Sequence, residues 1–224
     1  ATAYGALGPE TEDLGVEQNR NYEIGTKWEL FDRHALLTFA IFRTDKDDAR
    51  EQAPSAGPGI PGVWGNSGEA RVDGAELGVS GNVTDAWSVA GGVSHIDTEI
   101  TDSANPDNIG LELANVAEKS LTLLNRYEVT DKFALGMTAT YRDEVNGGTW
   151  AAAPIPATGK LSEIPDYWRF DLLAEYQITQ QLAARLNVLN AADERYYDAL
   201  YRSAVPFVYV APGRSGFVTL TYDF

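Results

Sequence analysis

The chain has 224 residues, no cysteine, a single methionine and two histidines, and its formal net charge is −16. This acidic balance argues against a nucleic-acid partner, because phosphate binding is driven by Lys and Arg. No run of about 18 apolar residues exists, which excludes a transmembrane helix. The absence of cysteine is compatible with a reducing cytosol or with an outer membrane. No leader and no initiating Met open the chain, so we expect Ala1 to be a processed or truncated start.

The dominant pattern is a two-residue alternation of apolar and polar side chains. In residues 133–141, for example, Leu135 and Met137 fall on one face while Gly136 and Thr138 fall on the other. No stretch shows a comparable helical period, so the pattern predicts an all-β chain of antiparallel strands. Nine segments carry it: residues 21–30, 36–45, 71–83, 87–96, 121–129, 133–141, 168–178, 182–190 and 218–224.

The connections between these segments alternate in length. Short ones fall at residues 31–34, 84–86, 130–131 and 179–181, and long ones at roughly 46–68, 97–118, 147–166 and 191–213. A soluble sandwich has no reason to lengthen every second loop. A transmembrane β-barrel does, because its turns are short on the periplasmic side and long outside.

The two faces of the predicted strands also fit a bilayer. Aromatic residues stand near the ends of the apolar faces, as the two membrane interfaces select. A soluble all-β protein, with these rings in its core, is the alternative, but nine such strands would then need a second sheet to cover them. We expect these side chains to face outward onto lipid: Leu77, Val79, Leu135, Met137, Phe170 and Leu172. We expect these to face inward: Glu23, Glu76, Arg142, Arg169 and Asp171.

Four motifs resemble strands of TonB-dependent receptors. Residues 17–27 (EQNRNYEIGTK) resemble E-x-x-x-x-Y-E-x-G-x-K, and residues 71–78 (RVDGAELG) resemble x-V-x-G-x-E-x-x. Residues 186–197 (LNVLNAADERYY) resemble x-N-V-x-N-L-F-D-x-x-Y-Y, with Ala-Ala in place of Leu-Phe. The PGR at residues 212–214, ahead of a final strand ending in Phe, resembles the family's closing motif. Each motif is weak alone, but four in family order with correct spacing are specific.

The resemblance implies a fold, a place and an activity. It makes residues 1–224 about the nine C-terminal strands of a plugged, roughly 22-stranded antiparallel transmembrane β-barrel in the outer membrane of a Gram-negative bacterium. The plug domain and the segment that contacts the TonB–ExbB–ExbD complex would lie outside this chain. The implied function is TonB-energised import of ferric siderophores, most closely of the catecholate subgroup. The alternatives are a TonB-dependent transporter of cobalamin or oligosaccharides, and a passive porin-like channel.

The same resemblance assigns a role to the end of the chain. Tyr222 and Phe224 resemble the C-terminal signature that is read by the barrel-assembly machinery. Their plainer interpretation is an aromatic girdle. Lipopolysaccharide is a further expected partner, because acidic residues in the segment 97–118 could share a hard cation with its phosphates, although a solvated loop is the simpler interpretation.

No residue spacing favours catalysis, a resident metal or a cofactor, so the sequence predicts that the protein is not an enzyme and that iron arrives only within its ligand. A bulky, aromatic and anionic ferric catecholate calls for Arg, Lys and aromatic rings at the receptor mouth. The same side chains could instead pack the loops or form the outer girdle. The candidate ligand-binding residues are Arg142, Trp150, Tyr197, Tyr201, Arg202 and Tyr209.

Overall fold

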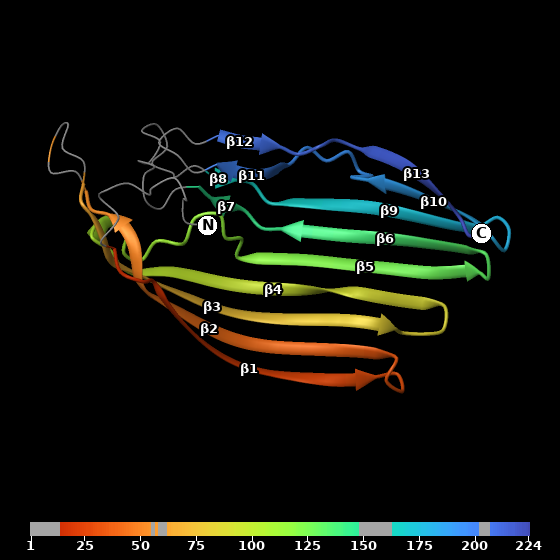
Figure 1. Cartoon of the computed structure of the whole chain (residues 1–224), viewed down its shortest axis with the longest axis horizontal. Helices are drawn as coiled ribbons and strands as arrows, with labels where there is room; N and C mark the ends of the chain where they lie inside the picture. Colours follow the sequence, from red (N-terminus) through yellow and green to blue (C-terminus); the bar gives the residue numbers. More distant parts are fainter. Residues whose placement is uncertain (1–13, 55–56, 58–61, 148–162, 202–206) are drawn as a thin grey trace.

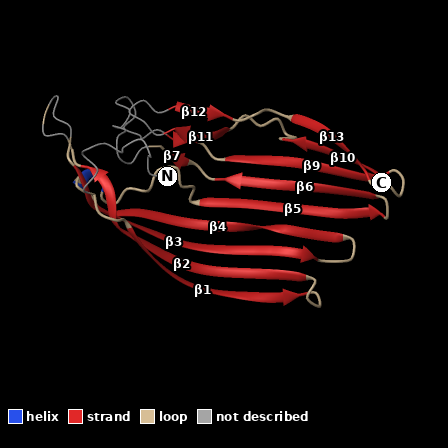
Figure 2. Ribbon diagram, viewed as in Figure 1, coloured by secondary structure: helices blue, strands red, loops and turns tan. Residues whose placement is uncertain are grey.

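The computed structural model describes residues 14–54, 57, 62–147, 163–201 and 207–224. Within these ranges the chain is almost entirely β-strand, as Figure 2 shows. The one helical element described there is a single 3₁₀ turn, Pro106–Asn108. No helix in the described ranges is long and apolar enough to cross a membrane.

One antiparallel sheet contains nine strands, and each strand pairs with the next one along the chain that belongs to the sheet (Figure 1). They are β1 (Gln18–Leu30), β2 (Ala35–Gln52), β3 (Trp64–Asn82), β4 (Trp87–Asp102), β5 (Lys119–Thr130), β6 (Phe133–Arg142), β9 (Tyr167–Gln177), β10 (Leu182–Leu189) and β13 (Ser215–Tyr222). Two short pairs lie in the connections: β7 (Val145–Asn146) with β8 (Glu163–Ile164), and β11 (Tyr197–Tyr201) with β12 (Phe207–Val210). The predicted nine-stranded antiparallel sheet is confirmed.

The connections sort by length to the two ends of the sheet. The four short turns, β1–β2, β3–β4, β5–β6 and β9–β10, lie at the same end as the C-terminus (Figure 1). The four long connections, β2–β3, β4–β5, β6–β9 and β10–β13, leave from the opposite end. This is the arrangement that the alternating loop lengths predict.

The boundaries predicted for two of the long loops are wrong. Strand β2 continues to Gln52 and β3 already begins at Trp64, so much of the expected loop 46–68 is paired strand. Strand β4 likewise runs on to Asp102, into the expected loop 97–118. The ladder continues past irregularities near Ala49 because backbone hydrogen bonds need no apolar side chains. The alternation of apolar and polar side chains ends with the apolar band, but the hydrogen-bonded strands continue beyond it.

The register places the predicted outward and inward residues on opposite faces, because directly paired residues share a face. Leu77 pairs with Phe39 and Val93 on the face that we call outer. On the other, inner face, one row runs across five strands: Glu76, Ser94, Ser120, Arg142 and Tyr167. The predicted division into two faces is therefore confirmed.

The sheet has almost no core of its own. Among the described residues only Ile100 and Val145 are large side chains that are fully buried, and both lie towards the loop end. Apolar side chains of the outer face remain open, such as Leu135 at 47% and Leu172 at 44% exposure. A folded soluble chain buries such a continuous apolar surface, so this face needs a non-aqueous covering.

Candidate functional site: two faces and a mouth

The apolar band on the outer face crosses the strands obliquely. Trp28 of β1 and Tyr222 of β13 mark the lower aromatic edge of the outer face at the two sides of the sheet. The row of directly paired residues that starts at Trp28 reaches β9 at Phe170. The row that starts at Tyr222 passes through Leu182 and reaches β9 at Ile178. The aromatic edge thus shifts by eight residues, from 170 to 178. Eight residues correspond to ~27 Å along a strand, and the nine strands span ~38 Å across the sheet. The ratio of these two lengths gives a strand tilt of roughly 35°. Barrel strands tilt by about that angle.

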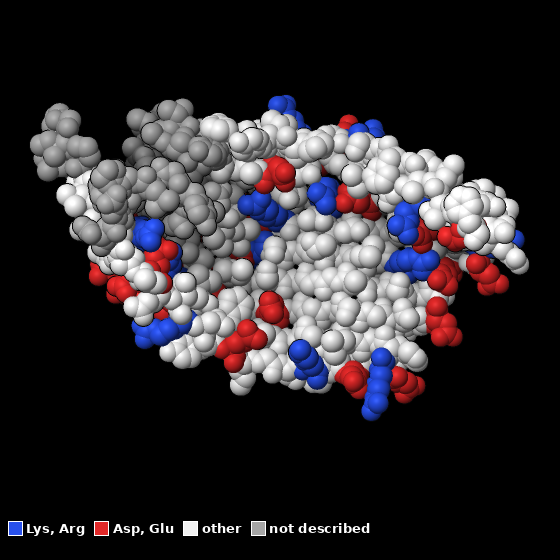
Figure 3. All heavy atoms as spheres, in the orientation of Figure 1, with Lys and Arg blue, Asp and Glu red and all other residues white. Residues whose placement is uncertain are grey.

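The inner face is hollowed and carries acidic and basic side chains side by side (Figure 3). Near the short turns, residues of β5, β6, β9, β10 and β13, charged side chains among them, line a cavity of about 390 Å³. There Glu175 lies between two arginines: Nε of Arg126 is 2.8 Å and Nη2 of Arg185 is 2.5 Å from its carboxylate oxygens. Arg126 also contacts Glu128 at 2.8 Å. At this end the inner wall therefore carries a network of ion pairs that is open to water.

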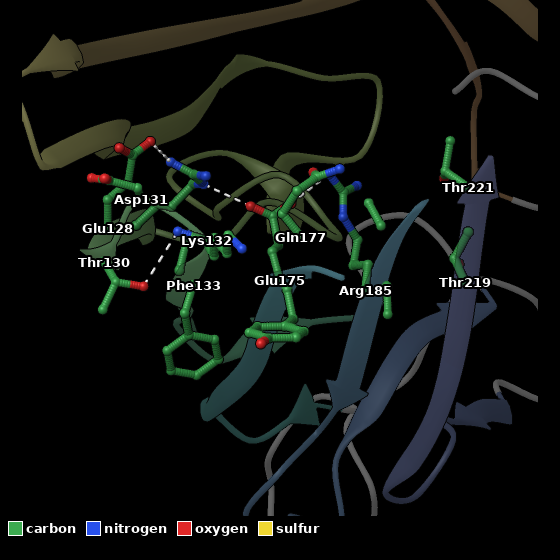
Figure 4. Close-up of a pocket in the computed structure, with 15 residues that line it drawn as sticks. Glu128, Thr130, Asp131, Lys132, Phe133, Glu175, Gln177, Arg185, Thr219 and Thr221 are labelled. Carbon is green, nitrogen blue, oxygen red and sulfur yellow. Dashed lines mark hydrogen bonds and ion pairs between the residues drawn. The ribbon is translucent and has the colours of Figure 1, made fainter. Parts of the chain in front are cut away.

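Small residues on β6 let this network form. Arg126 on β5 and Glu175 on β9 stand two strands apart, with Gly136 and Ala134 of β6 between them in the register. Neither of these residues has a side chain long enough to block the contact. Figure 4 shows Glu175 at the centre of the network, with the ring of Phe133 pointing away from the cavity.

At the opposite end, the long connections pack on one another. Val145 of β7, Ile164 of β8 and Leu200 of β11 form a small buried cluster, against which Ala117 and Tyr197 pack. A backbone hydrogen bond of 2.9 Å from Asn115 to Asn146 joins the β4–β5 connection to the β6–β9 connection. We call this loop end of the sheet the mouth. Its described parts form one connected unit.

The structure brings several of the sequence-predicted ligand residues to this mouth. Arg142, at the end of β6, donates through Nη1 to the carbonyl oxygen of Asp198 in β11, at 2.9 Å. Tyr197 and Tyr201 belong to β11, and Tyr209, half exposed, stands on β12 opposite Ala199. Two further candidates lie outside the described residues: Trp150 and Arg202.

Just inside the mouth, the inner wall carries a cluster of tyrosine and arginine side chains whose geometry the sequence did not predict. The rings of Tyr167 and Tyr196 lie 4.3 Å apart. Arg169 donates through Nη1 to the Tyr196 hydroxyl at 3.3 Å, and its Nη2 is 3.1 Å from a carboxylate oxygen of Asp171. Counting the alternation back from Arg169 would have put Tyr167 on the inner face, but only the fold brings Tyr196 to it.

The turn after β10 fastens this wall to the last strand. Asn190, buried and with φ of 50°, donates its backbone N–H to Asp171 at 2.8 Å. Its side-chain amide donates to the carbonyl oxygens of Glu194 at 2.8 Å and Pro212 at 3.3 Å. Asn tolerates this left-handed conformation better than most residues. The Ala-Ala departure at residues 191–192 leaves the hydrogen-bonding Asn in place.

No group of three or more His, Asp or Glu residues in the described part of the chain could hold a metal ion. The tilted strands, the apolar outer face, the charged inner face and the sorted connections define the chain as part of the wall of a transmembrane-type β-barrel.

Comparison with known proteins then identifies the family. The family model for the TonB dependent receptor-like β-barrel matches residues 1–191. The chain therefore belongs to that family of receptors, as its motifs indicated, and not to a family of enzymes.

Individual relatives agree with this assignment. A probable TonB-dependent siderophore receptor, PiuA of Acinetobacter baumannii, is 31% identical over 97% of this chain. The catecholate siderophore receptor Fiu of Escherichia coli is 32% identical over 85% of it. The crystal structure of PiuA superposes with a TM-score of 0.79 at 32% identity over 91% of this chain and 28% of PiuA, and the closed form of Fiu with 0.78 at 28% identity over 98% of this chain and 30% of Fiu. The chain spans only 28% and 24% of the lengths of the two curated relatives.

Proposed function

We propose that this chain forms part of the barrel wall and mouth of an outer-membrane receptor that imports ferric siderophores, with energy supplied through TonB. The observation that carries the proposal is the Arg- and Tyr-rich mouth on a barrel wall whose relatives are named as siderophore receptors. Arginine and aromatic rings suit an anionic, aromatic ferric catecholate. The candidate contacts are Arg142, Tyr197, Tyr201 and Tyr209, together with Trp150 and Arg202.

The remaining partners follow from the same proposal. TonB–ExbB–ExbD would act through the part of the receptor that precedes this barrel segment, and the assembly machinery through Tyr222 and Phe224. Lipopolysaccharide would meet the outer face above the apolar band. The acidic residues of the segment 97–118 support this last contact, because carboxylate and phosphate oxygens together suit a shared hard cation.

A growth test addresses the proposed function. The full-length receptor is expressed in a Gram-negative strain that lacks its own catecholate receptors and is starved of iron. Growth restored by a ferric catecholate, and lost when TonB is deleted, is the expected result. Growth on a ferric catecholate without TonB would indicate a porin-like channel. No growth on any ferric siderophore, with uptake of cobalamin or an oligosaccharide instead, would assign a different ligand.

A further inference from the structure

The connection between β4 and β5 folds back onto the β2–β3 hairpin at the mouth. Its 3₁₀ turn, Pro106–Asn108, contacts β4 and is drawn in blue at the loop end in Figure 2. Beside it, Ala70 of β3 pairs directly with Ile100 of β4, and both side chains are buried. Buried side chains are rare in this single-layered sheet, so the connection forms a second layer here. We call its residues 103–108 the strap.

A buried carboxylate joins the strap to the hairpin. Glu51 of β2 is 3% exposed. The Ser103 hydroxyl donates to its Oε2 at 2.8 Å, and the Ala104 N–H and the Ser67 hydroxyl donate to its Oε1, each at 2.6 Å. All three donors are neutral groups, and two of them belong to the strap. A buried charge is costly unless hydrogen bonds satisfy it, so the carboxylate depends on the strap that it holds.

This carboxylate stands on the inner side of the hairpin. Gly68 of β3 falls on the inner face, because it alternates in step with Glu76. A Cβ atom at Gly68 would lie 3.6 Å from the carboxyl carbon of Glu51. The strap, which donates to the same carboxylate, therefore covers the wall from the side of the barrel interior.

Ser103 restricts which side chain can occupy position 51. Its hydroxyl oxygen accepts hydrogen bonds from the Asn105 N–H at 3.1 Å and from the Asn108 side-chain amide at 3.3 Å. A hydroxyl has two lone pairs and one proton, so Ser103 can only donate to Glu51. The Ala104 N–H can only donate as well. Both oxygens of the carboxylate must accept, and a glutamine amide would place a donor against a donor in either orientation.

We propose that residues 103–108 form a strap over one side of the mouth and that the ionised carboxylate of Glu51 is its latch. Release of the latch frees the strap as a unit while the sheet stays paired, because the ladder between β3 and β4 continues to Asp102. The hydrogen bond between Asn115 and Asn146 fixes the connection beyond the strap. The latch controls access to the inner wall, and this holds for any ligand that the receptor imports.

Amide hydrogen exchange of the full-length receptor in detergent micelles, followed by mass spectrometry, tests the latch. The strap reports on itself, because the N–H groups of residues 104, 105, 107 and 108 all donate to Glu51 or within the strap. The variants are Glu51→Gln and Ser103→Ala, alone and combined. The matched control is Glu69→Gln, which removes the same charge from an exposed position of the same hairpin.

We expect Glu51→Gln to raise the exchange rates of residues 104–108 by about 10- to 100-fold, as for the loss of one or two hydrogen bonds to a charged group. Ser103→Ala should raise them by about tenfold. The combined variant should exceed the larger single effect by no more than about threefold, because both changes break the same latch. Glu69→Gln should change them by less than about twofold. Exchange in the β5–β6 ladder should stay the same in every variant.

Unchanged exchange of the strap in Glu51→Gln would overturn the latch. So would an equal rise in Glu69→Gln, which would reflect the charge of the hairpin, or a rise spread evenly over the nine strands, which would make Glu51 a support of the whole sheet. If Glu51→Gln does not assemble, Ser103→Ala removes the same contact without changing a charge, and unchanged strap exchange in that variant overturns the proposal equally. Effects that multiply in the combined variant would show two separate contacts and no latch.

Discussion

The outer and inner faces of the same nine strands are stabilised by opposite kinds of contact. On the outer face large apolar side chains stand open, and Met137 on this face is 40% exposed. One residue further along, Thr138 faces the charged inner wall, opposite Asp171. The sheet lacks a central packed core, so its own side chains cannot supply the usual hydrophobic stabilisation. Backbone ladders and an apolar environment at the outer face therefore stabilise the wall, while charge pairs organise its inner face.

The largest expected effect comes from placing one charge on each face in turn. Met137→Arg puts a guanidinium on the outer face, away from both edges of the apolar band, and should destabilise the full-length receptor by about 2–4 kcal/mol in lipid vesicles. Thr138→Arg should cost less than about 1 kcal/mol, because its side chain reaches water and Asp171. Urea unfolding in vesicles measures both free energies. Equal losses for the two variants would break the distinction between the faces.

The central acid of the inner network should show the next largest effect. Glu175→Gln leaves Arg126 and Arg185 without their shared carboxylate, and should lower the unfolding free energy by about 1–2 kcal/mol. Glu128→Gln is the control, since this half-exposed residue has a single pair with Arg126 and should cost about 0.5 kcal/mol or less. A larger loss for Glu128→Gln would place the centre of the network elsewhere.

The last residue tests the outer face at its lower edge. Phe224 packs edge-on against Tyr222, with ring centroids 5.1 Å apart. An aromatic pair contributes about 0.5–1.5 kcal/mol, so deleting Phe224 should lower the amount of assembled receptor by roughly two- to tenfold. Translation should be unchanged. Heat-modifiable receptor in outer-membrane fractions, compared with total protein, measures this, and equal assembly would reduce Phe224 to a girdle residue.

The smallest expected effect concerns the ion pairs above the apolar band. The hydrogen bond from Arg43 holds the pKa of Asp73 below its ordinary value. A lowered carboxyl pKa adds stability above the unfolded pKa of about 4, and this stability is lost as the pH falls through the lower folded value. Because the pair is exposed, the change should stay below about 1 kcal/mol. Unfolding measured between about pH 6 and pH 3 should show it in the wild type and not in Asp73→Asn.

The strands and their faces could be predicted because the signal is local. Alternation places Met137 and Thr138 on opposite sides without knowledge of any partner strand. The extent of the strands could not, since β2 and β3 continue beyond the apolar band on backbone hydrogen bonds alone. Two of the six predicted ligand residues, Trp150 and Arg202, lie outside the described residues, and the ligand roles of the other four stay predictions.

Long-range contacts at the mouth had no sequence signal. Glu51 falls in the long connection predicted at residues 46–68, yet it is 3% exposed. Its carboxylate accepts hydrogen bonds from the Ser67 and Ser103 hydroxyls at 2.6 and 2.8 Å and from the Ala104 N–H at 2.6 Å. These donors come from β3 and from the β4–β5 connection. Such a buried carboxylate is tolerated only because the fold surrounds it with donors.

The sequence by itself determined the all-β class, the number of strands in the sheet, the two faces and the sorting of short and long connections. Each of these depends on residues a few positions apart. The tertiary structure alone decided that Arg169 meets Tyr196, that Arg126 reaches Glu175 across Gly136 and Ala134, and that Glu51 is buried. Such contacts join residues far apart in the chain, and their positions follow from register and strand tilt. Backbone pairing across the whole sheet sets both, so no local pattern of side chains encodes them.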